Sequence, residues 1–334
     1  MSKYSYESIE NQDQNMKTWF KPKIDPKTLK ELTKRKDSPG WINTITYFAV
    51  LIISGYIAFL SWGTWWALPA FFIYGTIYAF SNARWHEYGH RSVFKTRWLN
   101  DLFYYISSFF SYFEPVSWRW SHTHHHSRTI HQDIDYEIQV SRPSNLLDLF
   151  FFDLFGIKRV YFEFKKILLH SFGIMTPVAL DCVPENQRSK MIWSSRIFIL
   201  IKLVFIMWAL SIESFLPLMF VVLPNMYGSP IFQMTTMLQH GGLRADTWDH
   251  RESTRTFLVN PIHGWLLYFN MQYHVEHHLF PQVPFYNLPK LHKIIKDELP
   301  EPNRGFISAL TEMIPAILKQ SKDPKYFIKR NIEA

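Results

Sequence analysis

Long runs of uncharged residues alternate with polar stretches along the chain. The clearest run covers residues 41–60 (WINTITYFAVLIISGYIAFL), which contain no charged side chain. A helix of about 20 apolar residues crosses the roughly 30 Å hydrocarbon core of a bilayer. Lys202 lies near the start of a later run, where a lysine can extend its ammonium group to the interface. The pattern predicts membrane-spanning helices near residues 41–60, 65–80, 197–210 and 215–232.

Two other apolar stretches have a different pattern. Residues 99–113 are too short to span a bilayer and predict a re-entrant or interfacial helix. Residues 145–172 alternate Leu and Phe with charged residues at helical spacing, which predicts a helix along the membrane surface. We expect an all-α integral membrane fold with about four spans and a cytoplasmic helical cap. Its expected parts are a cytoplasmic N-terminal segment (1–40), a membrane domain (41–292) and a cytoplasmic C-terminal tail (293–334).

The distribution of positive charge predicts the orientation. The short connections at residues 61–64 and 211–214 contain no Lys or Arg, whereas the N-terminus, the middle and the C-terminal third contain many. Because cytoplasmic loops carry the excess of Lys and Arg, both termini are expected in the cytoplasm. This bias accounts for most of the net charge of +8. The dispersed lysines form no single stripe, so we expect no nucleic-acid partner.

Composition narrows the class of protein further. Aromatic residues make up 18% of the chain and charged residues 19%, against a globular norm of about 25% charged, so disorder is excluded. A mean hydropathy of −0.12 still requires large water-facing parts beside the spans. Cys182 is the single cysteine, which excludes internal disulfides, cysteine-ligated zinc, iron–sulfur clusters and covalent haem attachment. If the protein does redox chemistry, its electrons must come from elsewhere.

Histidine is the informative excess, with 15 residues that crowd into short stretches next to the predicted spans. The clusters read HEYGH at 86–90, HTHHH at 122–126 and HVEHH at 274–278. Residues at i, i+3 and i+4 share one helix face, so the histidines of each cluster can converge on one point, while His124 faces away. Eight imidazoles suit two metal ions with four ligands each. The candidate ligands are His86, His90, His122, His125, His126, His274, His277 and His278.

Other interpretations stay open at this point. The first cluster alone fits HExxH, in which two histidines bind zinc and Glu87 is the general base of a membrane protease. One catalytic zinc takes three protein ligands, however, and so leaves most of the clustered histidines unused. His240 follows the fourth predicted span and is either a ninth ligand or a capping residue before glycine. Ordinary surface roles are expected for His131, His170, His250, His263 and His292.

The complete pattern, HxxxH, HxxHH and HxxHH with spans between, resembles the membrane fatty acid desaturase and hydroxylase superfamily, the histidine-box di-iron enzymes. The resemblance runs from about residue 41 to residue 292 and is especially close in NMQYHVEHHLFPQVP (270–284). QHGGL at 239–243 and DHRESTRT at 249–256 resemble bacterial desaturases and hydrocarbon oxygenases, including a rhizopine-catabolism oxygenase that uses a small Rieske-type ferredoxin.

The resemblance implies two iron ions held by the eight clustered histidines, with His240 as a ninth ligand. Thr236 stands where animal acyl-CoA desaturases have an Asn near the second metal, which puts the detailed coordination in doubt but not the metal count. Neighbouring polar groups should orient the imidazoles. Candidates for that role are Glu87, Asn270, Glu276, Asp133, Asp135 and Glu137, although acids after a turn are often only exposed. Trp118, Arg119 and Trp120 could face a substrate head group or the interface.

The expected reaction is O₂-dependent oxidation of an unactivated C–H bond in a lipid or acyl substrate, with desaturation favoured. The alternatives are hydroxylation or oxidative demethylation, or a non-catalytic metal-binding or structural membrane protein. With no haem, flavin or dinucleotide motif in the sequence, a ferredoxin, as in the Rieske-type relative, and its reductase are the expected electron donors. The expected location is the bacterial inner membrane.

Overall fold

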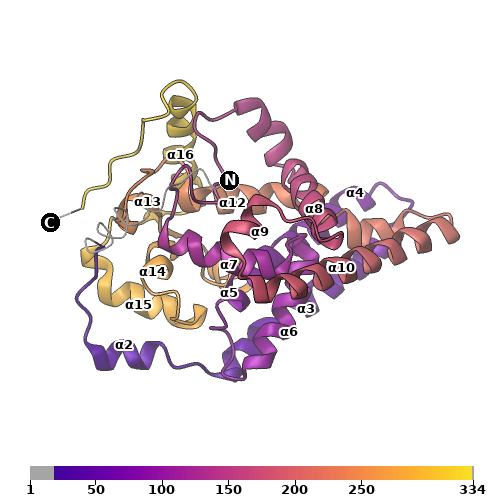
Figure 1. Cartoon of the computed structure of the whole chain (residues 1–334), viewed down its shortest axis with the longest axis horizontal. Coiled ribbons are helices and arrows are strands. Elements are labelled where there is room, and N and C mark those ends of the chain that lie inside the picture. Colours follow the sequence, from indigo (N-terminus) through magenta and orange to yellow (C-terminus); the bar gives the residue numbers. More distant parts are fainter. Residues whose placement is uncertain (1–18, 333–334) are drawn as a thin grey trace.

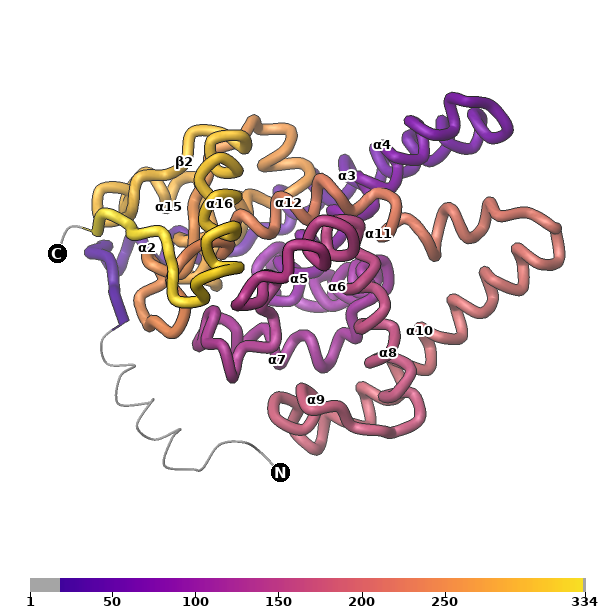
Figure 2. Tube along the Cα trace, turned by 90° about the horizontal axis from the view of Figure 1, so that it is seen from above, coloured from indigo at the N-terminus to yellow at the C-terminus, as the bar shows by residue number. Residues whose placement is uncertain are grey.

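Two helical arms project from a body that carries the histidine clusters (Figure 2). The computed structural model describes residues 19–332. One arm consists of α3 (Asp37–Leu60) and α4 (Ala67–Ala79). The other consists of α10 (Glu185–Ser211) and the return segment formed by η3 (Leu218–Val222), α11 (Pro224–Tyr227) and the start of α12 (Ser229–His240).

Two of the predicted spans are supported as helices long enough to cross a membrane. Among the described residues, Asp37–Ser61 and Glu185–Ser211 have the required length and apolar composition. Both expose large apolar side chains that only lipid or a partner could cover. These include Ile52, Ile53, Ile57, Leu60, Leu200, Leu203, Met207 and Leu210, with Trp65 and Trp66 at the tip of the first arm.

The other two predicted spans are not confirmed, since the first forms one short helix and the second is divided. The 13 residues of α4 rise about 20 Å, short of the roughly 30 Å hydrocarbon core. The segment at 215–232 is divided into η3, α11 and α12. Pro217 directly precedes η3, Pro224 is the first residue of α11, and Pro230 is the second residue of α12. Proline has no backbone N–H and clashes with the preceding turn, so an apolar run with three prolines cannot continue as one helix. Four full spans are therefore not confirmed.

Tyrosine hydroxyl groups compensate for the break in the return segment. The Tyr74 hydroxyl donates to Phe220 O at 2.8 Å and the Tyr78 hydroxyl to Val221 O at 3.2 Å. The hydroxyls of Tyr112 and Tyr227 donate to Val222 O and Met219 O. A carbonyl without a partner is costly in hydrocarbon, so irregular backbone at membrane depth requires partners of this kind.

Glycines let the two arms touch backbone to backbone at one point. A Cβ atom added to Gly228 would lie 1.9 Å from the carbonyl carbon of Gly75, and one added to Gly75 would lie 2.2 Å from the Tyr227 ring. Only glycine allows α4 and the start of α12 to approach this closely.

We expect Gly228→Ala to destabilise the protein more than Gly55→Ala. The new methyl group of Gly228→Ala meets rigid backbone, whereas that of Gly55→Ala meets the Tyr74 ring at 3.0 Å, which can shift. Overpacking typically costs about 1–3 kcal/mol, and we place Gly228→Ala at or above the top of that range. Unfolding of both variants in mixed detergent micelles measures the difference. Equal stability of the two variants would contradict the backbone contact.

One large apolar core holds much of the body together. This core joins α5, α6, α12 and the C-terminal helix α16 through side chains such as Phe80, Tyr104, Leu238 and Met313. The remaining elements are α2 (Pro26–Leu32), α5 (Ser81–Gly89), α6 (Arg97–Ser111), α7 (Pro115–Ser127), η2 (Asp148–Asp153), α8 (Ile157–Ser171), α9 (Pro177–Cys182), α13 (His250–Ser253), β1 (Phe257–Leu258), η4 (Ile262–Leu267), α14 (His274–Leu279), η5 (Phe285–Asn287), α15 (Leu288–Ile295), η6 (Lys296–Glu298), β2 (Asn303–Arg304) and α16 (Phe306–Gln320).

The C-terminal region, predicted as a tail at residues 293–334, contributes to this body. Parallel pairing of β1 with β2 joins Phe257 to Asn303, and α16 buries Ala309 and Ile317. The first 18 residues of the predicted N-terminal segment lie outside the described residues. The division into segment, membrane domain and tail stays a prediction.

The two amphipathic predictions correspond to α6 and to the pair η2 and α8. α6 buries Tyr104 and exposes Leu102. η2 and α8 are separated by Gly156, whose φ of 65° breaks the helix. Together they expose apolar side chains such as Phe151 and Tyr161, as a helix lying on a membrane surface would require. Their location relative to the bilayer remains a prediction.

Candidate metal centre

The nine histidines singled out from the sequence come together between α5, α7, α12 and α14. Their ring nitrogens form two groups. The first group contains His86, His90, His122, His126 and His277, whose candidate ligand atoms all lie within 4.8 Å of one another. The second group contains His125, His240 and His278 at the same spacing. His274 joins the second group, because its Nε2 lies 3.0 Å from His240 Nε2 and 3.1 Å from His278 Nε2.

This grouping corrects the expectation that each cluster converges on a single point. In the second cluster, His122 and His126 belong to the first group and His125 to the second. In the third cluster, His277 belongs to the first group, while His274 and His278 belong to the second. The expected four-and-four division becomes five and four. One turn of α7 and one turn of α14 therefore each contribute to both groups, which brings the two groups side by side.

The positions of the nitrogens fit a cation at the first group. The Nε2 atoms of His90, His122 and His126 lie 3.1–3.2 Å from one another in a triangle. When Nδ1 of a neutral imidazole carries the proton, its Nε2 has only a lone pair. Three such Nε2 atoms cannot hydrogen-bond to one another, because their lone pairs face each other. A metal ion about 2.1 Å from each nitrogen would place adjacent ligands about 3 Å apart, as observed. Imidazole suits iron, copper, nickel and zinc.

Buried carboxylates hold the opposite ring nitrogens. Glu137 Oε2 lies 2.7 Å from His122 Nδ1, and Asp135 Oδ2 lies 2.8 Å from His125 Nδ1. Glu87 Oε1 lies 3.3 Å from Nδ1 of both His86 and His277. A carboxylate on Nδ1 fixes the orientation of the ring and leaves Nε2 free to bind a metal. The geometry favours the predicted orienting role for these three acids.

Three further contacts involve groups that the sequence analysis did not single out. His240 Nδ1 donates to Ser253 O at 2.8 Å, Thr129 Oγ1 lies 3.1 Å from His278 Nδ1, and the Gln239 amide contacts His274 Nδ1 at 3.3 Å. A backbone carbonyl and a threonine carry no metal signal in a sequence. The only sequence feature that could have indicated a role for Gln239 is its position directly before His240.

Two of the other residues predicted to orient the ligands hydrogen-bond instead to residues outside the two histidine groups. Glu276 accepts from His292 Nδ1 and, at 2.6 Å, from Thr256 Oγ1. Asn270 donates to Phe285 O at 3.0 Å and accepts from Gln272 Nε2. Both side chains support the chain around α14.

Burial controls the protonation of the site in the metal-free chain. Burial and the neighbouring imidazoles lower the pKa of His122 and His126 well below the usual value, so these rings are neutral and able to bind metal. Burial lowers the pKa of His125, but Asp135 and Glu137 raise it to a net value of about 9. Burial also raises the pKa of Glu137 to about 8, a shift that a bound cation would oppose.

Three of the five histidines expected on the surface are buried, so that prediction is wrong for them: His131, His170 and His250. His250 packs 5.1 Å from the His278 ring, and His170 contacts Thr176 Oγ1 at 2.8 Å. They lack partners at i+3 and i+4, so no sequence pattern indicated that tertiary packing would bury them.

The position of Glu87 argues against the zinc-protease interpretation. Its side chain is fully buried and faces Nδ1 of two histidines, on the side of those rings away from the Nε2 atoms. A general base must reach the water or substrate that reacts at the metal. Glu87 can orient ligands but cannot serve as that base.

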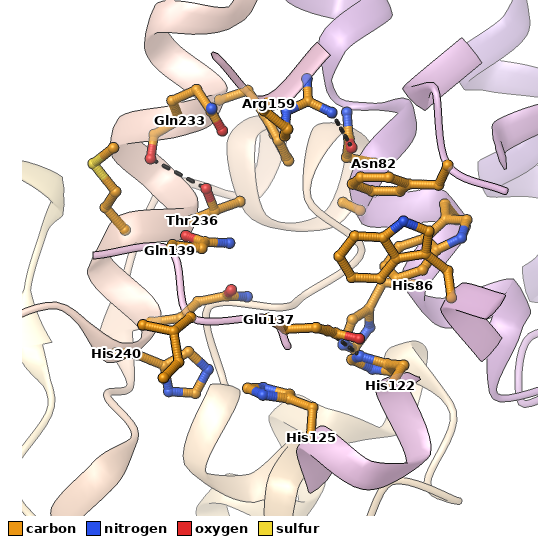
Figure 3. A pocket seen from close by; sticks show the side chains of 18 of the residues that line it. Asn82, His86, His122, His125, Glu137, Gln139, Arg159, Gln233, Thr236 and His240 are labelled. Atoms are coloured by element: carbon orange, nitrogen blue, oxygen red, sulfur yellow. Dashed lines mark hydrogen bonds and ion pairs between the residues drawn. The ribbon is translucent and has the colours of Figure 1, made fainter. Parts of the chain in front are cut away.

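One cavity of about 320 Å³ touches both histidine groups. Five of the nine histidines line it: His86, His122, His125, His240 and His274. Apolar side chains from Trp85, Phe113, Trp118, Phe232 and Met237 form part of its wall. Figure 3 shows Asn82, Arg159 and Gln233 across the cavity from His122, His125 and His240.

The residues expected near a substrate head group differ in their placement. Trp118 lines the cavity, and its Nε1 donates to Glu163 at 2.7 Å. Arg119 pairs with Asp101 at 2.9 Å, and Trp120 packs near α9. Thr236 also lines the cavity, and its hydroxyl donates to Gln233 O at 3.1 Å (Figure 3).

The fold and the site define a helical, membrane-associated protein with two adjoining histidine groups that could each hold a metal ion. The profile of the fatty acid desaturase family matches residues 63–309, well over half of the chain. The chain therefore belongs to the fatty acid desaturase family. This match contains every one of the nine histidines.

Several characterised relatives share parts of the sequence. An sn-1 oleoyl-lipid 12-desaturase of Synechocystis sp. is 34% identical over 116 residues, which cover 33% of this chain and 31% of that protein. A fatty acid conjugase of Calendula officinalis is 23% identical over 300 residues, covering 82% of this chain and 78% of the relative. An sn-1 oleoyl-lipid 12-desaturase of Picosynechococcus sp. is 24% identical over 286 residues, covering 81% and 80%.

Proposed function

We propose that this protein is an O₂-dependent fatty acyl desaturase of lipid metabolism. The observation that carries the proposal is that both histidine groups line one cavity in a member of the fatty acid desaturase family. The reaction converts a CH₂–CH₂ unit, O₂, two electrons and two protons into a CH=CH unit and two molecules of water. No amino-acid side chain alone removes hydrogen from such a carbon, so a redox-active metal pair is required.

The nine histidines of the two groups are the proposed ligands of two iron ions. When bound, the iron pair supplies the O₂-derived oxidant that removes hydrogen from the substrate. The chain orients the imidazoles through Glu87, Asp135 and Glu137. The cavity walls hold one pair of carbons beside the site and exclude bulk water.

The proposed substrate is an acyl chain drawn from the bilayer. Two of the relatives act, by their names, on oleoyl lipids. The exposed apolar surfaces of α3 and α10 support residence in the membrane. A multi-pass arrangement, with both termini and the histidine body on the cytoplasmic side of a bacterial inner membrane, follows from the distribution of Lys and Arg. A ferredoxin reduced by its own reductase is the proposed electron donor.

Reaction under ¹⁸O₂ is expected to give a new double bond, with the label recovered in water and none in the lipid. Desaturation removes two hydrogens and adds no oxygen, which is the physical basis of this expectation. Mass spectrometry of the lipids after incubation measures both quantities. A labelled alcohol, or formaldehyde released from a methyl ether, would show instead that the site hydroxylates. A displacement on the order of 1 Å changes such rates about 100-fold, so the position of the substrate decides between these outcomes.

A further inference from the structure

Exposed lysine side chains gather on α2 and α15, which pack against each other. Residues 21–36 contain seven Lys or Arg residues against two acids, and α15 with the turn after it adds three exposed lysines against the two acids Asp297 and Glu298. Leu32 of α2 packs in one apolar cluster with Leu291 and Ile295 of α15, so the charges of the two helices share one surface. We call this surface the basic face. Its exposed side chains include Lys27, Lys30, Lys36, Lys290, Lys293 and Lys296.

The basic face lies away from the tips of the two arms. In both views, α2 and α15 occupy the end of the molecule opposite the tips of the two arms (Figures 1 and 2). Trp65 and Trp66 mark the tip of the first arm, and exposed apolar residues run along α10 from Trp193 to Leu210. The charge of anionic lipid head groups is screened within about 8 Å at physiological ionic strength. Lys36 directly precedes the spanning helix α3 and so lies near lipid head groups, whereas Lys290 and Lys293 belong to α15 in the body and are available to a partner in the cytoplasm.

The basic face is also connected directly to a helix that bears candidate ligands. His292 of α15 is only 13% exposed, and its Nδ1 donates to Glu276 Oε1. Glu276 is fully buried and directly precedes His277 in α14. One hydrogen bond and one peptide unit therefore connect α15 to a histidine of the first group. Because electron tunnelling falls steeply with distance, a donor should dock where such a connection reaches the surface.

We propose that the basic face formed by α2 and α15 docks the acidic, one-electron redox protein that supplies this enzyme with electrons. The inference rests on the proposed function and adds the place and the chemistry of the partner. Each double bond requires two electrons, so two reduced donor molecules are oxidised in turn while the two protons come from water. Charges around such a docking surface steer the encounter and raise association rates by about 10- to 1,000-fold.

Binding of an acidic [2Fe–2S] ferredoxin in its oxidised form tests the proposal without turnover. The full chain is placed in nanodiscs of phosphatidylcholine, and the variant is Lys290→Glu with Lys293→Glu. The matched control is Lys322→Glu with Lys325→Glu, two exposed lysines beyond the end of α16. We expect the dissociation constant of the double variant to rise at least about tenfold, mainly through slower association. The control should change less than twofold, and added salt should weaken wild-type binding.

Turnover separates this inference from the proposed function. In the double variant, we expect the KM for reduced ferredoxin to rise, while the rate with dithionite and methyl viologen and the iron content stay within twofold of wild type. Equal ferredoxin binding by wild type and double variant would overturn the docking proposal. A binding defect of the double variant that appears only in discs containing phosphatidylglycerol would also overturn it, because such a defect would assign the lysines to lipid. If wild type binds ferredoxin but forms no double bond with either reductant, the desaturase proposal fails and the docking surface stands.

Discussion

Replacing His125 or His277 with alanine is expected to abolish turnover and to remove metal from the protein. His125 belongs to the second histidine group and His277 to the first, so the pair tests both groups. Each substitution removes a nitrogen from its group. His125→Ala also leaves the buried Asp135 without its imidazole partner, whereas in His277→Ala Glu87 keeps His86 as a partner. The loss should exceed the 10- to 100-fold typical of residues that only orient a ligand. Metal analysis should give about two irons per wild-type chain and one or fewer per variant.

His124→Ala is the matched control for this experiment. His124 neighbours His125 on the same helix, but its Nδ1 accepts from Arg128 at 3.4 Å and its ring belongs to neither group. We expect this variant to keep both metals and most of its activity. Circular dichroism and gel filtration confirm that each variant is folded before metal is measured. Two irons retained in His125→Ala, or metal lost from His124→Ala, would contradict the assignment of the groups.

The sequence predicted two long apolar helices correctly because their signal is local. The run at 41–60 contains no charge and no proline, and it forms most of α3. The run at 215–232 is equally apolar, yet its prolines divide it. The break is tolerated because Tyr74 and Tyr112, far away in the chain, donate to the freed carbonyl groups. Hydropathy detects the apolar run but cannot show which distant hydroxyl groups will stabilise an irregular backbone.

The sequence showed which residues form the candidate site but not how they are arranged in it. Spacing at i, i+3 and i+4 identified the clustered histidines, and the structure brings all of them together with His240. Spacing could not divide them between two groups, because neighbours such as His277 and His278 contribute to different groups. That division depends on how α5, α7, α12 and α14 cross, which is a tertiary property. The same limit explains why the burial of His250 was missed.

Removing the carboxylate of Glu87 should lower metal affinity at the first group by about 10- to 100-fold, or about 1.4–2.7 kcal/mol. The same oxygen, Oε1, lies 3.3 Å from Nδ1 of both His86 and His277, so one side chain orients two rings. In Glu87→Ala the His86 N–H would lose its hydrogen-bond acceptor, the His277 ring would lose the carboxylate beside its Nδ1, and each ring could rotate. Glu87→Gln keeps one acceptor oxygen and should lose less. Competition for iron between the protein and a chelator of known affinity measures the change.

Glu114→Gln provides the matched control for Glu87→Gln. Glu114 is also buried, but it accepts from the backbone N–H groups of Val116 and Ser117 at the start of α7, a role that an amide oxygen can partly retain. We expect this variant to lose stability while its metal affinity stays within about twofold of wild type, because no ring nitrogen depends on it. Equal loss of metal affinity in both variants would assign Glu87 a general packing role. A specific loss in Glu87→Gln ties metal affinity to one buried oxygen shared by two helices, α5 and α14.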